Sequence, residues 1–482
     1  MMNRISIVVT VVVILAGVYI MANQLGLVDS LDFGAGAYYY ADMPGFEKLV
    51  NGNHYQSPVS MGTLISVQDG KIVQIDKTKN SDFHKVSGEN AMPDNYLEDS
   101  QIIKDYQWFH RHPELGHEET ETTAHIKEAL QEAGIEILQL PSENKTGVIA
   151  VIRGKGESVS SDRGPVVALR TDIDGLPVEE MTDVSYKSLY PGRMHACGHD
   201  FHMASVLQAA RLLQQTKEEW SGTVKVIFQP AEELPGGAKE MVETGLLEDV
   251  DAYVGLHTTP GRPSGAIGIR AGGLMAAVDR FEVTVSGRGC HGAAPHEGID
   301  VIPVICQIVT ALQTIVSRQV DPFSPAVLSV TAISAGNTWN VIPSEGSFCG
   351  TVRSFSPQVR AQIRERFYRL TEQIAGANGA ESRIDWYEGP PAVINDEGLC
   401  KIATQTAAES GYQVYEPEQT MVGEDFSFYQ EKQKGIFLRV GTGYGKPLHH
   451  PEFLADSAAL EPTAEYLAIL VKKLLAEMSE VS

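Results

Sequence analysis

Cysteine and basic residues are scarce in this sequence of 482 residues. The five cysteines are odd in number and widely spaced, so they define no disulfide framework, and we expect most of them to be small buried residues. Lysine and arginine total 38 against 62 acidic residues, which gives a formal net charge of −24. This balance argues against anionic lipid and against nucleic acid as partners, because binding to phosphates requires a basic surface.

Long apolar runs are also absent, except at the N-terminus. Residues 5–22 carry no charge, and this length is about the shortest that crosses a hydrocarbon core of roughly 30 Å. Arg4 precedes the run and Asp29 follows it, which by the positive-inside bias exports the rest of the chain. We therefore expect residues 1–28 to anchor the protein in a membrane, with the remainder periplasmic or extracellular. A cleaved signal peptide, which releases a secreted protein, is the alternative.

The remaining sequence has the organisation of a folded chain with several domains. Its length and its 43% hydrophobic residues predict two or three domains with full cores. Residues 29–96 form a spacer to which we assign no chemistry; in it, TLISVQDGKIVQI predicts a β-hairpin that turns at Asp69-Gly70. From residue 97 onward apolar strands and amphipathic helices alternate, which predicts an α/β fold: a mostly parallel sheet with helices on both faces.

A second domain interrupts this alternation. Residues 279–388 have the order strand, helix, strand, strand, helix, strand, which is the β-α-β-β-α-β order of a split βαβ sandwich. After Gly389 the chain turns on two prolines and the βα alternation resumes. We therefore predict that residues 97–278 and 389–482 build the main domain and that residues 279–388 are inserted in it.

The residues that carry chemistry are densest in the segment MHACGHDFH. Cys197 and His199 lie where a loop meets a predicted helix, so a thiolate and an imidazole can point to one spot, and the helix N-terminus favours the thiolate. By itself this spacing is a weak signal. A buried cysteine beside a capping histidine is the alternative reading.

Further candidate ligands follow predicted strands or lie in a loop near the C-terminus. Glu232 and Glu233 come directly after a strand, at the edge where open α/β sheets bind ligands. Two adjacent carboxylates repel each other, so the pair requires a cation or a shared proton unless both are solvated in a loop. His257 closes the next strand, and the segment PLHHP places His449 on a rigid loop.

Sulfur, nitrogen and oxygen donors are thus combined in one predicted site. This mixture suits Zn²⁺ or a similar first-row ion better than Ca²⁺ or Mg²⁺. Two ions about 3.5–4 Å apart could share such ligands together with a bridging water. The carboxylate beside the ligand would then be the base that deprotonates the water, so the pattern predicts a metal-dependent hydrolase.

The chain from about residue 97 to the C-terminus resembles the M20 metallopeptidase family, in particular its amidohydrolase branch. That branch contains the hippurate, N-acyl-amino-acid and auxin-conjugate hydrolases. The resemblance is carried by a series of motifs in order, namely FHRHPELGHEE, RTDIDGLPVEE, MHACGHDFHMA, FQPAEELPGGAK, GLHTTP, HGAAPHEGID, NVIP, GTVRSF, GEDFSFY and LHHP. The sequence departs from the usual pattern at Gly175, Phe201 and Met203, which could reshape the pocket but removes none of the proposed ligands.

The resemblance implies a role for each of these residues. It implies two divalent ions, zinc or manganese, and Glu232 as the general base. In the LHHP motif it favours His449 over His450. Asp172 and Asp174 would orient the ligands from behind, with capping of a strand end as the alternative. The implied metal ligands are Cys197, His199, Glu233, His257 and His449.

The inserted domain resembles the lid and dimerisation domain of the family, which implies a homodimer. His291 would reach the carbonyl of the scissile bond, often across the dimer; capping of the inserted domain's strand is the alternative. Asn340 and Arg353 would hold the carboxylate of the substrate, and a guanidinium suits that task because it binds carboxylate bidentately. For Arg353 the alternative is a surface arginine on a strand.

The expected activity is hydrolysis of N-acyl amino acids or similar small amide conjugates, which releases a carboxylic acid and a free amino acid. A dipeptidase or aminopeptidase-like peptidase is the nearest alternative, because the same groups cleave both kinds of bond. A catalytically silent, membrane-tethered binding protein is less favoured, because Glu232 and every implied ligand are present.

Overall fold

The protein is described here from a computed structural model. The residues that the structure describes are 54–56, 63–68, 71–77, 100–155 and 164–481. The chain divides into two compact units, Met1–Tyr96 and Leu97–Ser482, and each is described by itself. The apolar run at residues 5–22 lies outside the described residues, so the membrane anchor stays a prediction.

A three-stranded antiparallel sheet is the described part of the first unit. Its strands are β1 (His54–Gln56), β2 (Thr63–Gln68) and β3 (Lys71–Lys77), in the order β1-β2-β3. Strands β2 and β3 pair from Gln68↔Lys71 outward, which confirms the predicted hairpin. The pairing follows from two β-rich runs on either side of an Asp-Gly dipeptide.

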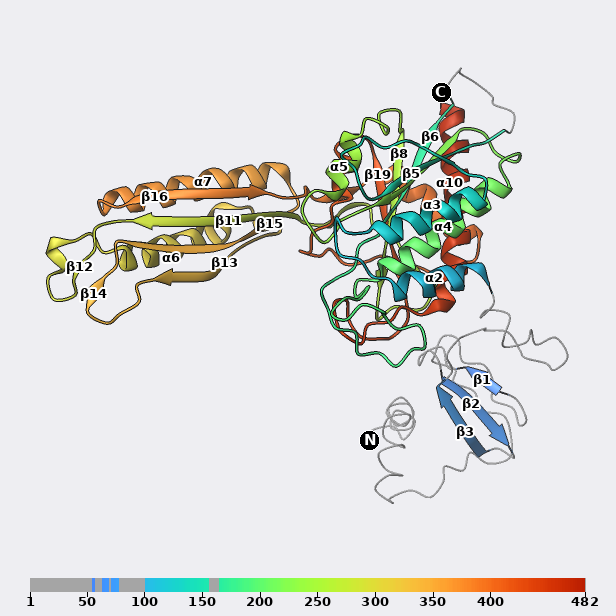
Figure 1. The fold of residues 1–482 in the computed structure, drawn as a ribbon, viewed down its shortest axis with the longest axis horizontal. Helices are drawn as coiled ribbons and strands as arrows, with labels where there is room; N and C mark the ends of the chain where they lie inside the picture. The colour runs from blue at the N-terminus through green and yellow to red at the C-terminus, as the bar shows by residue number, and fades with distance from the viewer. Residues whose placement is uncertain (1–53, 57–62, 69–70, 78–99, 156–163, 482) are drawn as a thin grey trace, which may run out of the picture. The chain divides into compact units, whose positions relative to one another are not determined.

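An eight-stranded sheet is the framework of the second unit, with the order β18-β9-β19-β8-β6-β7-β5-β4 (Figure 1). Its four middle strands, β19, β8, β6 and β7, are parallel, and β5 pairs antiparallel with β7. The predicted mostly parallel sheet is therefore confirmed. The strands are β4 (Glu136–Ile137), β5 (Val148–Arg153), β6 (Val166–Asp172), β7 (Thr223–Gln229), β8 (Ala252–Thr259), β9 (Ile267–Gly268), β18 (Val414–Tyr415) and β19 (Gly435–Gly441).

Helices cover both faces of this sheet. Every residue of β6 is buried, which is why its sequence is a continuous apolar run rather than an alternating one. Successive residues of β6 contribute to different cores: Val167 and Leu169 to the larger one, and Val166 and Ala168 to the smaller one. The larger core lies under α2 (Gln101–Arg111), α3 (Thr120–Glu132), α4 (His199–Gln215), α8 (Glu397–Glu409) and α10 (Leu460–Val481). The smaller core lies under α5 (Gly237–Glu243) and α9 (Ser427–Gln430).

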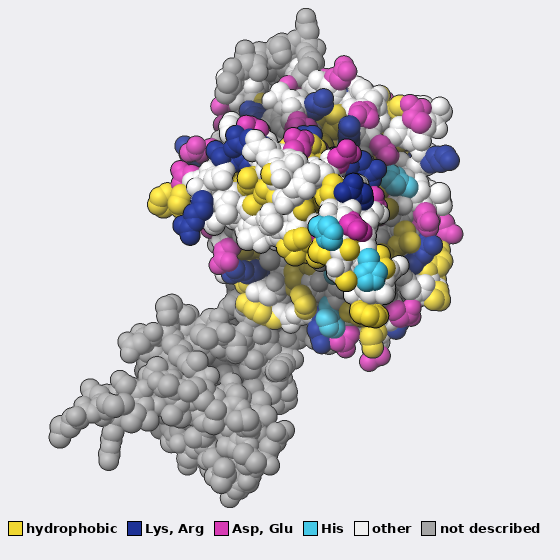
Figure 2. Space-filling model, turned by 90° about the vertical axis from the view of Figure 1, so that its left-hand side faces the viewer, with side chains coloured by type: hydrophobic (Ala, Val, Ile, Leu, Met, Phe, Trp, Pro, Cys, Tyr) yellow, Lys and Arg dark blue, Asp and Glu magenta, His cyan; other side chains and the backbone are white. Residues whose placement is uncertain are grey.

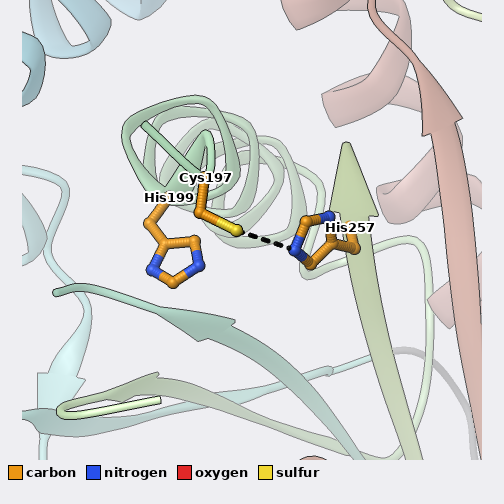
Figure 3. Close-up of side chains that lie close together, drawn as sticks. All are labelled: Cys197, His199 and His257. Atoms are coloured by element: carbon orange, nitrogen blue, oxygen red, sulfur yellow. Dashed lines mark hydrogen bonds between the residues drawn. The ribbon is translucent and has the colours of Figure 1, made fainter. Parts of the chain in front are cut away.

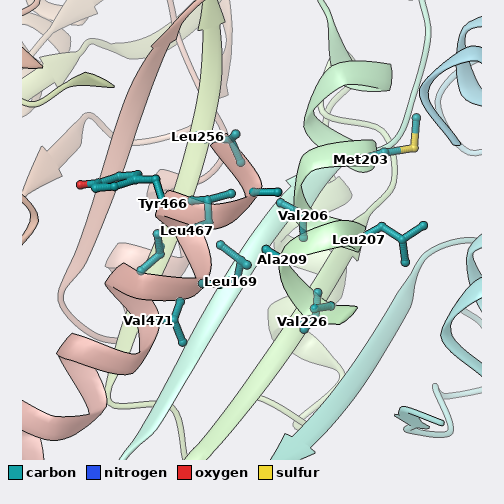
Figure 4. Close-up of a cluster of buried hydrophobic side chains, with 14 of the residues drawn as sticks. Leu169, Met203, Val206, Leu207, Ala209, Val226, Leu256, Tyr466, Leu467 and Val471 are labelled. Atoms are coloured by element: carbon teal, nitrogen blue, oxygen red, sulfur yellow. The ribbon is translucent and has the colours of Figure 1, made fainter. Parts of the chain in front are cut away.

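The larger core also holds two of the residues that depart from the family pattern. Met203 is buried on the side of α4 that faces away from the strands (Figure 4), and Phe201 is fully buried in the same core. Packing of these two side chains therefore helps to fix the position of α4. Because the core is close-packed, a larger or smaller side chain at either position would displace the helix that begins at His199.

A four-stranded antiparallel sheet with the order β13-β15-β11-β16 forms the inserted domain. Helices α6 and α7 pack against each other and against this sheet (Figure 1). A two-stranded sheet, β12 with β14, lies at the end remote from the eight-stranded sheet, and β10 pairs with β17 where the domain is joined to the main one. The elements are β10 (Gly272–Met275), β11 (Ala277–Ser286), β12 (Cys290–His291), η1 (Pro295–Glu297), α6 (Val301–Gln319), β13 (Ala326–Ala335), β14 (Val341–Ile342), β15 (Glu345–Ser354), α7 (Pro357–Ala377), β16 (Glu381–Glu388) and β17 (Val393–Asn395).

Helix α6 is the one helix among the described residues whose length and composition would allow it to cross a membrane. One stripe of it, including Val304, Ile308, Leu312 and Ile315, is buried in the core of the inserted domain. A buried stripe at this spacing is what a core helix of a folded domain presents to its sheet. The composition of α6 is therefore explained by packing.

Candidate active site

Cys197, His199 and His257 lie close together at the carboxyl ends of the parallel strands. Cys197 is in the loop before α4, His199 is the first residue of α4, and His257 belongs to β8, which continues two residues further than predicted. The Sγ atom of Cys197 is 3.3 Å from Nε2 of His257, and His199 points to the same spot from the other side (Figure 3). All three side chains are buried, and their donor atoms lie within 4.8 Å of one another.

Hydrogen bonds to the outer ring nitrogens fix both imidazoles. Nδ1 of His199 donates to the carbonyl oxygen of Asp174 at 2.9 Å, and Nδ1 of His257 donates to that of Thr258 at 2.8 Å. The Nε2 atom of each ring therefore presents its lone pair inward. Nε2 of His199 is buried and has no hydrogen-bond partner among the described residues. This arrangement is expected of histidines that bind a metal.

Glu233 and His449 extend the cluster. Nε2 of His449 lies 3.2 Å from Oε1 of Glu233, and donor atoms of both are within 4.8 Å of the Cys197 sulfur. His449 has a φ of 64°, an uncommon backbone conformation for a residue with a Cβ, which costs on the order of 1–3 kcal/mol. Its N–H donates to the carbonyl oxygen of Ala196 at 2.8 Å, so the loop is tied directly to the Cys197 segment.

All five predicted ligands thus form one connected cluster. One group of donor atoms is Cys197, His199 and His257, a second is Cys197, Glu233 and His449, and they share the thiol. A buried thiol, three imidazoles and a carboxylate are a donor set that fits first-row cations. Two groups that share one ligand are also what a pair of neighbouring cations requires.

Burial dominates the electrostatics of the thiol. It raises the pKa of Cys197 above the ordinary value, although His199 acts in the opposite direction. The predicted stabilisation of a thiolate by the start of α4 is therefore outweighed in the protein alone. A bound cation reverses this balance, because a coordinating thiol is deprotonated by the charge of the ion.

Glu232 lies beside this cluster, in the loop between β7 and α5. Its carboxylate forms a group with His199 and Glu233 and another with Glu424 and Asp425. Burial raises the pKa of Glu232 well above its usual range, and Glu424 and Asp425 raise it further. A carboxylate that accepts a proton more readily than usual is suited to act as a general base.

Asp172 and Asp174 lie behind the predicted ligands, and both are buried. Asp174 accepts a hydrogen bond from the N–H of Glu233 at 3.0 Å, and its Oδ1 is 3.1 Å from Nδ1 of His199. Asp172 does not bond His199 directly, since the distance is 3.8 Å. Its Oδ1 lies instead 2.7 Å from Nδ1 of His202, whose Nε2 accepts the N–H of Thr258 beside His257.

Arg170 is a central residue that the sequence reasoning missed. Its fully buried guanidinium forms ion pairs with Asp172 at 2.9 Å, Asp425 at 2.7 Å and Glu424 at 3.1 Å. It also donates to Gln229 at 2.8 Å. One signal was present, because a charged residue in the apolar run PVVALRTDID requires a partner when it is buried.

The inserted domain carries three residues that we predicted to contact the substrate, His291, Asn340 and Arg353. Within one chain, these three do not all lie close together. His291 and Asn340 lie at the remote end of the domain, where His291 pairs with Val341 and the N–H of Gly292 donates to the Asn340 carbonyl oxygen at 2.8 Å. Arg353 lies at the opposite end of β15, near the main domain. Its guanidinium is close to Gly423, because a Cβ atom added to that glycine would lie 3.7 Å from Nη1 of Arg353. Neither His291 nor Asn340 joins the metal-ligand cluster of the chain to which it belongs.

Comparison with known proteins shows the family to which the chain belongs. Residues 168–473 match the model of peptidase family M20/M25/M40. An N-acetyl-L-cysteine deacetylase of Bacillus subtilis is 44% identical over 78% of this chain and 89% of its own length. An IAA-amino acid hydrolase of Arabidopsis thaliana is 35% identical over 81% of this chain and 92% of its own.

A solved structure extends the agreement to the fold. The crystal structure of a dinuclear metal-binding peptidase of the M20 family from Bacillus subtilis has a TM-score of 0.70 and 42% identity, and the match covers 78% of this chain and 98% of that one. The family model and the relatives span both parts of the main domain and the insertion between them. The chain is therefore a member of peptidase family M20/M25/M40 and a hydrolase of its amidohydrolase branch.

Proposed function

We propose that the protein hydrolyses N-acyl amino acids or similar small amide conjugates and releases a carboxylic acid and a free amino acid. The observation that carries this proposal is the joining of all five predicted ligands in one cluster with Glu232 beside it. The names of the relatives, which include a deacetylase of N-acetyl-L-cysteine and an amino acid conjugate hydrolase, support the same substrate class.

We propose two divalent ions, zinc or manganese, as the cofactors. The ligands would be Cys197, His199, Glu233, His257 and His449. When bound, such a pair polarises the carbonyl of the amide and makes water a stronger acid. The relative that is described as a dinuclear metal-binding peptidase supports the number of ions.

Glu232 supplies the proton transfer in this proposal. Its carboxylate takes a proton from the attacking water and later delivers it to the nitrogen of the leaving amine, so that the base of the first step is the acid of the second. Burial and the neighbouring Glu424 and Asp425 raise the pKa of Glu232, which favours its taking up a proton. Its position next to the ligand Glu233 keeps it within reach of the reacting atoms.

His291 is suited to donate a hydrogen bond to the carbonyl oxygen of the substrate. The N–H of Ala293 donates to Nδ1 of His291 at 3.0 Å, so Nε2 of the neutral ring carries the proton. The ring is exposed at the remote end of the inserted domain, and Figure 2, which looks onto that end, shows histidine and hydrophobic side chains lying there side by side. The Nε2–H donor is therefore accessible to a partner that binds this end of the inserted domain.

We propose that this partner is a second copy of the chain. Within the described part of the chain, strand β13 is an edge of its sheet and its residues 331–334 are exposed, which leaves a row of backbone groups without a neighbouring strand. Ile333 on this edge, Val341 and Trp339 beside it are exposed by 54%, 52% and 93%. Apolar side chains along an open strand edge are typical of a surface that pairs.

The dimer would bring the substrate-directed residues together. When two β13 edges pair antiparallel about a two-fold axis, the remote end of one inserted domain lies beside the near end of the other. His291 and Asn340 of one copy would then meet Arg353 and the metal cluster of its partner. Arg353 is half-buried, and among the described residues its nearby acid Asp279 is paired with Arg360 instead. Its guanidinium is therefore available for a substrate carboxylate.

A substrate screen tests the proposed function. We expect the full-length protein, purified in detergent and supplied with Zn²⁺ or Mn²⁺, to release amino acids from N-acetyl and N-benzoyl amino acids. A chelator should abolish the release. Cleavage of dipeptides alone would replace the proposal by a dipeptidase, and inactivity on every substrate with metal bound would favour a binding protein.

Cys197→Ser is expected to lower metal content, because a hydroxyl is a far poorer ligand than a thiolate and Cys197 belongs to both donor groups. Elemental analysis after dialysis measures the change. Cys400→Ser is the matched control, since Cys400 is also buried but lies in α8, away from the cluster. Metal content unchanged from that of the wild type would make Cys197 a packing residue.

A further inference from the structure

The loop that carries Glu232 and Glu233 is held from outside by buried carboxylates. It runs from the end of β7 to the start of α5. Two backbone N–H groups of the loop and one from the first turn of α5 donate to acidic side chains from three other segments. These bonds are Ala231 N to Glu119 at 2.8 Å, Glu233 N to Asp174 at 3.0 Å and Ala238 N to Asp425 at 3.0 Å.

Two of these carboxylates also have other partners in the site. Asp174 lies against the ring of His199, and Asp425 is paired with Arg170. Glu119 differs, because it comes from the turn before α3 and is separated from Ala231 by 112 positions in the sequence. It is fully buried, and its bond to Ala231 ties this turn to the loop.

Ala231 has the conformation that most needs such support. Its φ is 49°, in the left-handed region that residues with a Cβ rarely adopt, and the residue is fully buried. Strained residues of this kind persist only where the surroundings determine them. One of these surroundings is Gly116, whose backbone packs tightly against Ala231. A Cβ atom added to Gly116 would lie 3.1 Å from Cα of Ala231 and 2.9 Å from Leu234.

The left-handed residue sets the direction of the chain into Glu232. Strand β7 ends at Gln229, and Ala231 turns the backbone immediately before the carboxylate that faces the cluster. Glu233 has a separate support through Asp174. Loss of the Glu119 bond should therefore disturb the residue that follows Ala231 more than it disturbs the neighbouring ligand.

We propose that Glu119 is a positioning residue, which holds Ala231 in its left-handed conformation and thereby directs the Glu232 carboxylate at the reacting atoms. This inference rests on the proposed role of Glu232 as the base. It assigns a task to the second acidic residue of the GHEE segment, which lies outside the ligand cluster.

Two substitutions at Glu119 test it. Glu119→Met has a similar length but no acceptor, and we expect kcat to fall by about 10–100-fold, because a small misplacement of a catalytic group has an effect of this order. We expect KM to stay within about threefold and metal content to be unchanged. Glu119→Gln keeps an acceptor for the Ala231 N–H and should retain kcat within about threefold of the wild-type value.

A rescue separates positioning from general stability. Glycine adopts positive φ without steric cost, so Ala231→Gly in the Glu119→Met background should recover at least about threefold in kcat. Amide hydrogen exchange at residues 230–234 should be faster in Glu119→Met than in the wild type. Glu128→Met, an exposed position in α3, is the matched control and should leave both kcat and exchange unchanged.

The outcomes distinguish this inference from the proposed function. A wild-type protein that cleaves no amide substrate would end the proposed function. An active wild type with Glu119→Met of equal kcat would overturn the inference alone. A Glu119→Gln variant as impaired as Glu119→Met, without rescue by Ala231→Gly, would also overturn it, because the hydrogen bond would not then be the cause of the loss.

Discussion

Glu232→Gln is expected to lower kcat by at least about 100-fold, the lower end of what loss of a general base costs. Glutamine has nearly the same shape but cannot accept a proton from water at neutral pH. Because Glu233 is supported by a backbone bond to Asp174, which a side-chain change at Glu232 does not remove, the ligand should stay in place. Metal content and KM should therefore remain near the wild-type values while turnover is lost.

The measurement compares kcat, KM and bound metal for the variant and a matched control. Glu243→Gln removes an exposed carboxylate from the nearby helix α5 and should behave as the wild type. Turnover by Glu232→Gln at a near-normal rate would refute the assignment of the base. A parallel loss of metal would instead place Glu232 among the ligands.

His291→Ala is expected to lower kcat by about 10²–10³, the usual effect of losing one donor to a developing oxyanion. The hydrogen bond from Nε2 strengthens as charge appears on the carbonyl oxygen, so kcat should fall more than KM rises. His296→Ala is the control, because His296 is an exposed histidine at the same end of the domain. If His291 only supports β12, its loss would lower thermal stability and leave kcat within a few-fold.

A mixing experiment shows which chain delivers His291. Glu232→Gln and His291→Ala proteins are each expected to be inactive alone. In a mixed dimer with delivery across the interface, one of the two sites has both Glu232 and His291, so full exchange of subunits should restore about a quarter of wild-type activity. Exchange without recovery would mean that His291 acts within its own chain, and delivery across the interface would have to be abandoned.

The sequence by itself determined the local chemistry and the class of fold. The alternation of apolar strands and helices predicted the parallel sheet, because a strand buried on both faces must be apolar throughout. Cys197 and His199 were found together because they are two positions apart at the start of one helix. Glu232 and Glu233 were found because acids that directly follow a buried strand lie at the ligand-binding edge of an α/β sheet.

Only the tertiary structure decided which residues support these ligands. It alone also decided where the inserted domain presents its substrate-directed residues. The partners of Arg170 include Asp425, 255 positions away, and no sequence period relates two such residues. Glu119 meets Ala231 only because the folded chain brings the turn before α3 against the residues that follow β7. His291 and Arg353 both lie in the inserted domain, yet a ten-residue strand separates the two ends at which they lie, since an extended chain advances about 3.3 Å per residue. Spacing in a sequence fixes which groups share a helix or a strand, whereas contacts between distant segments depend on how the folded chain buries its apolar faces and pairs its buried charges.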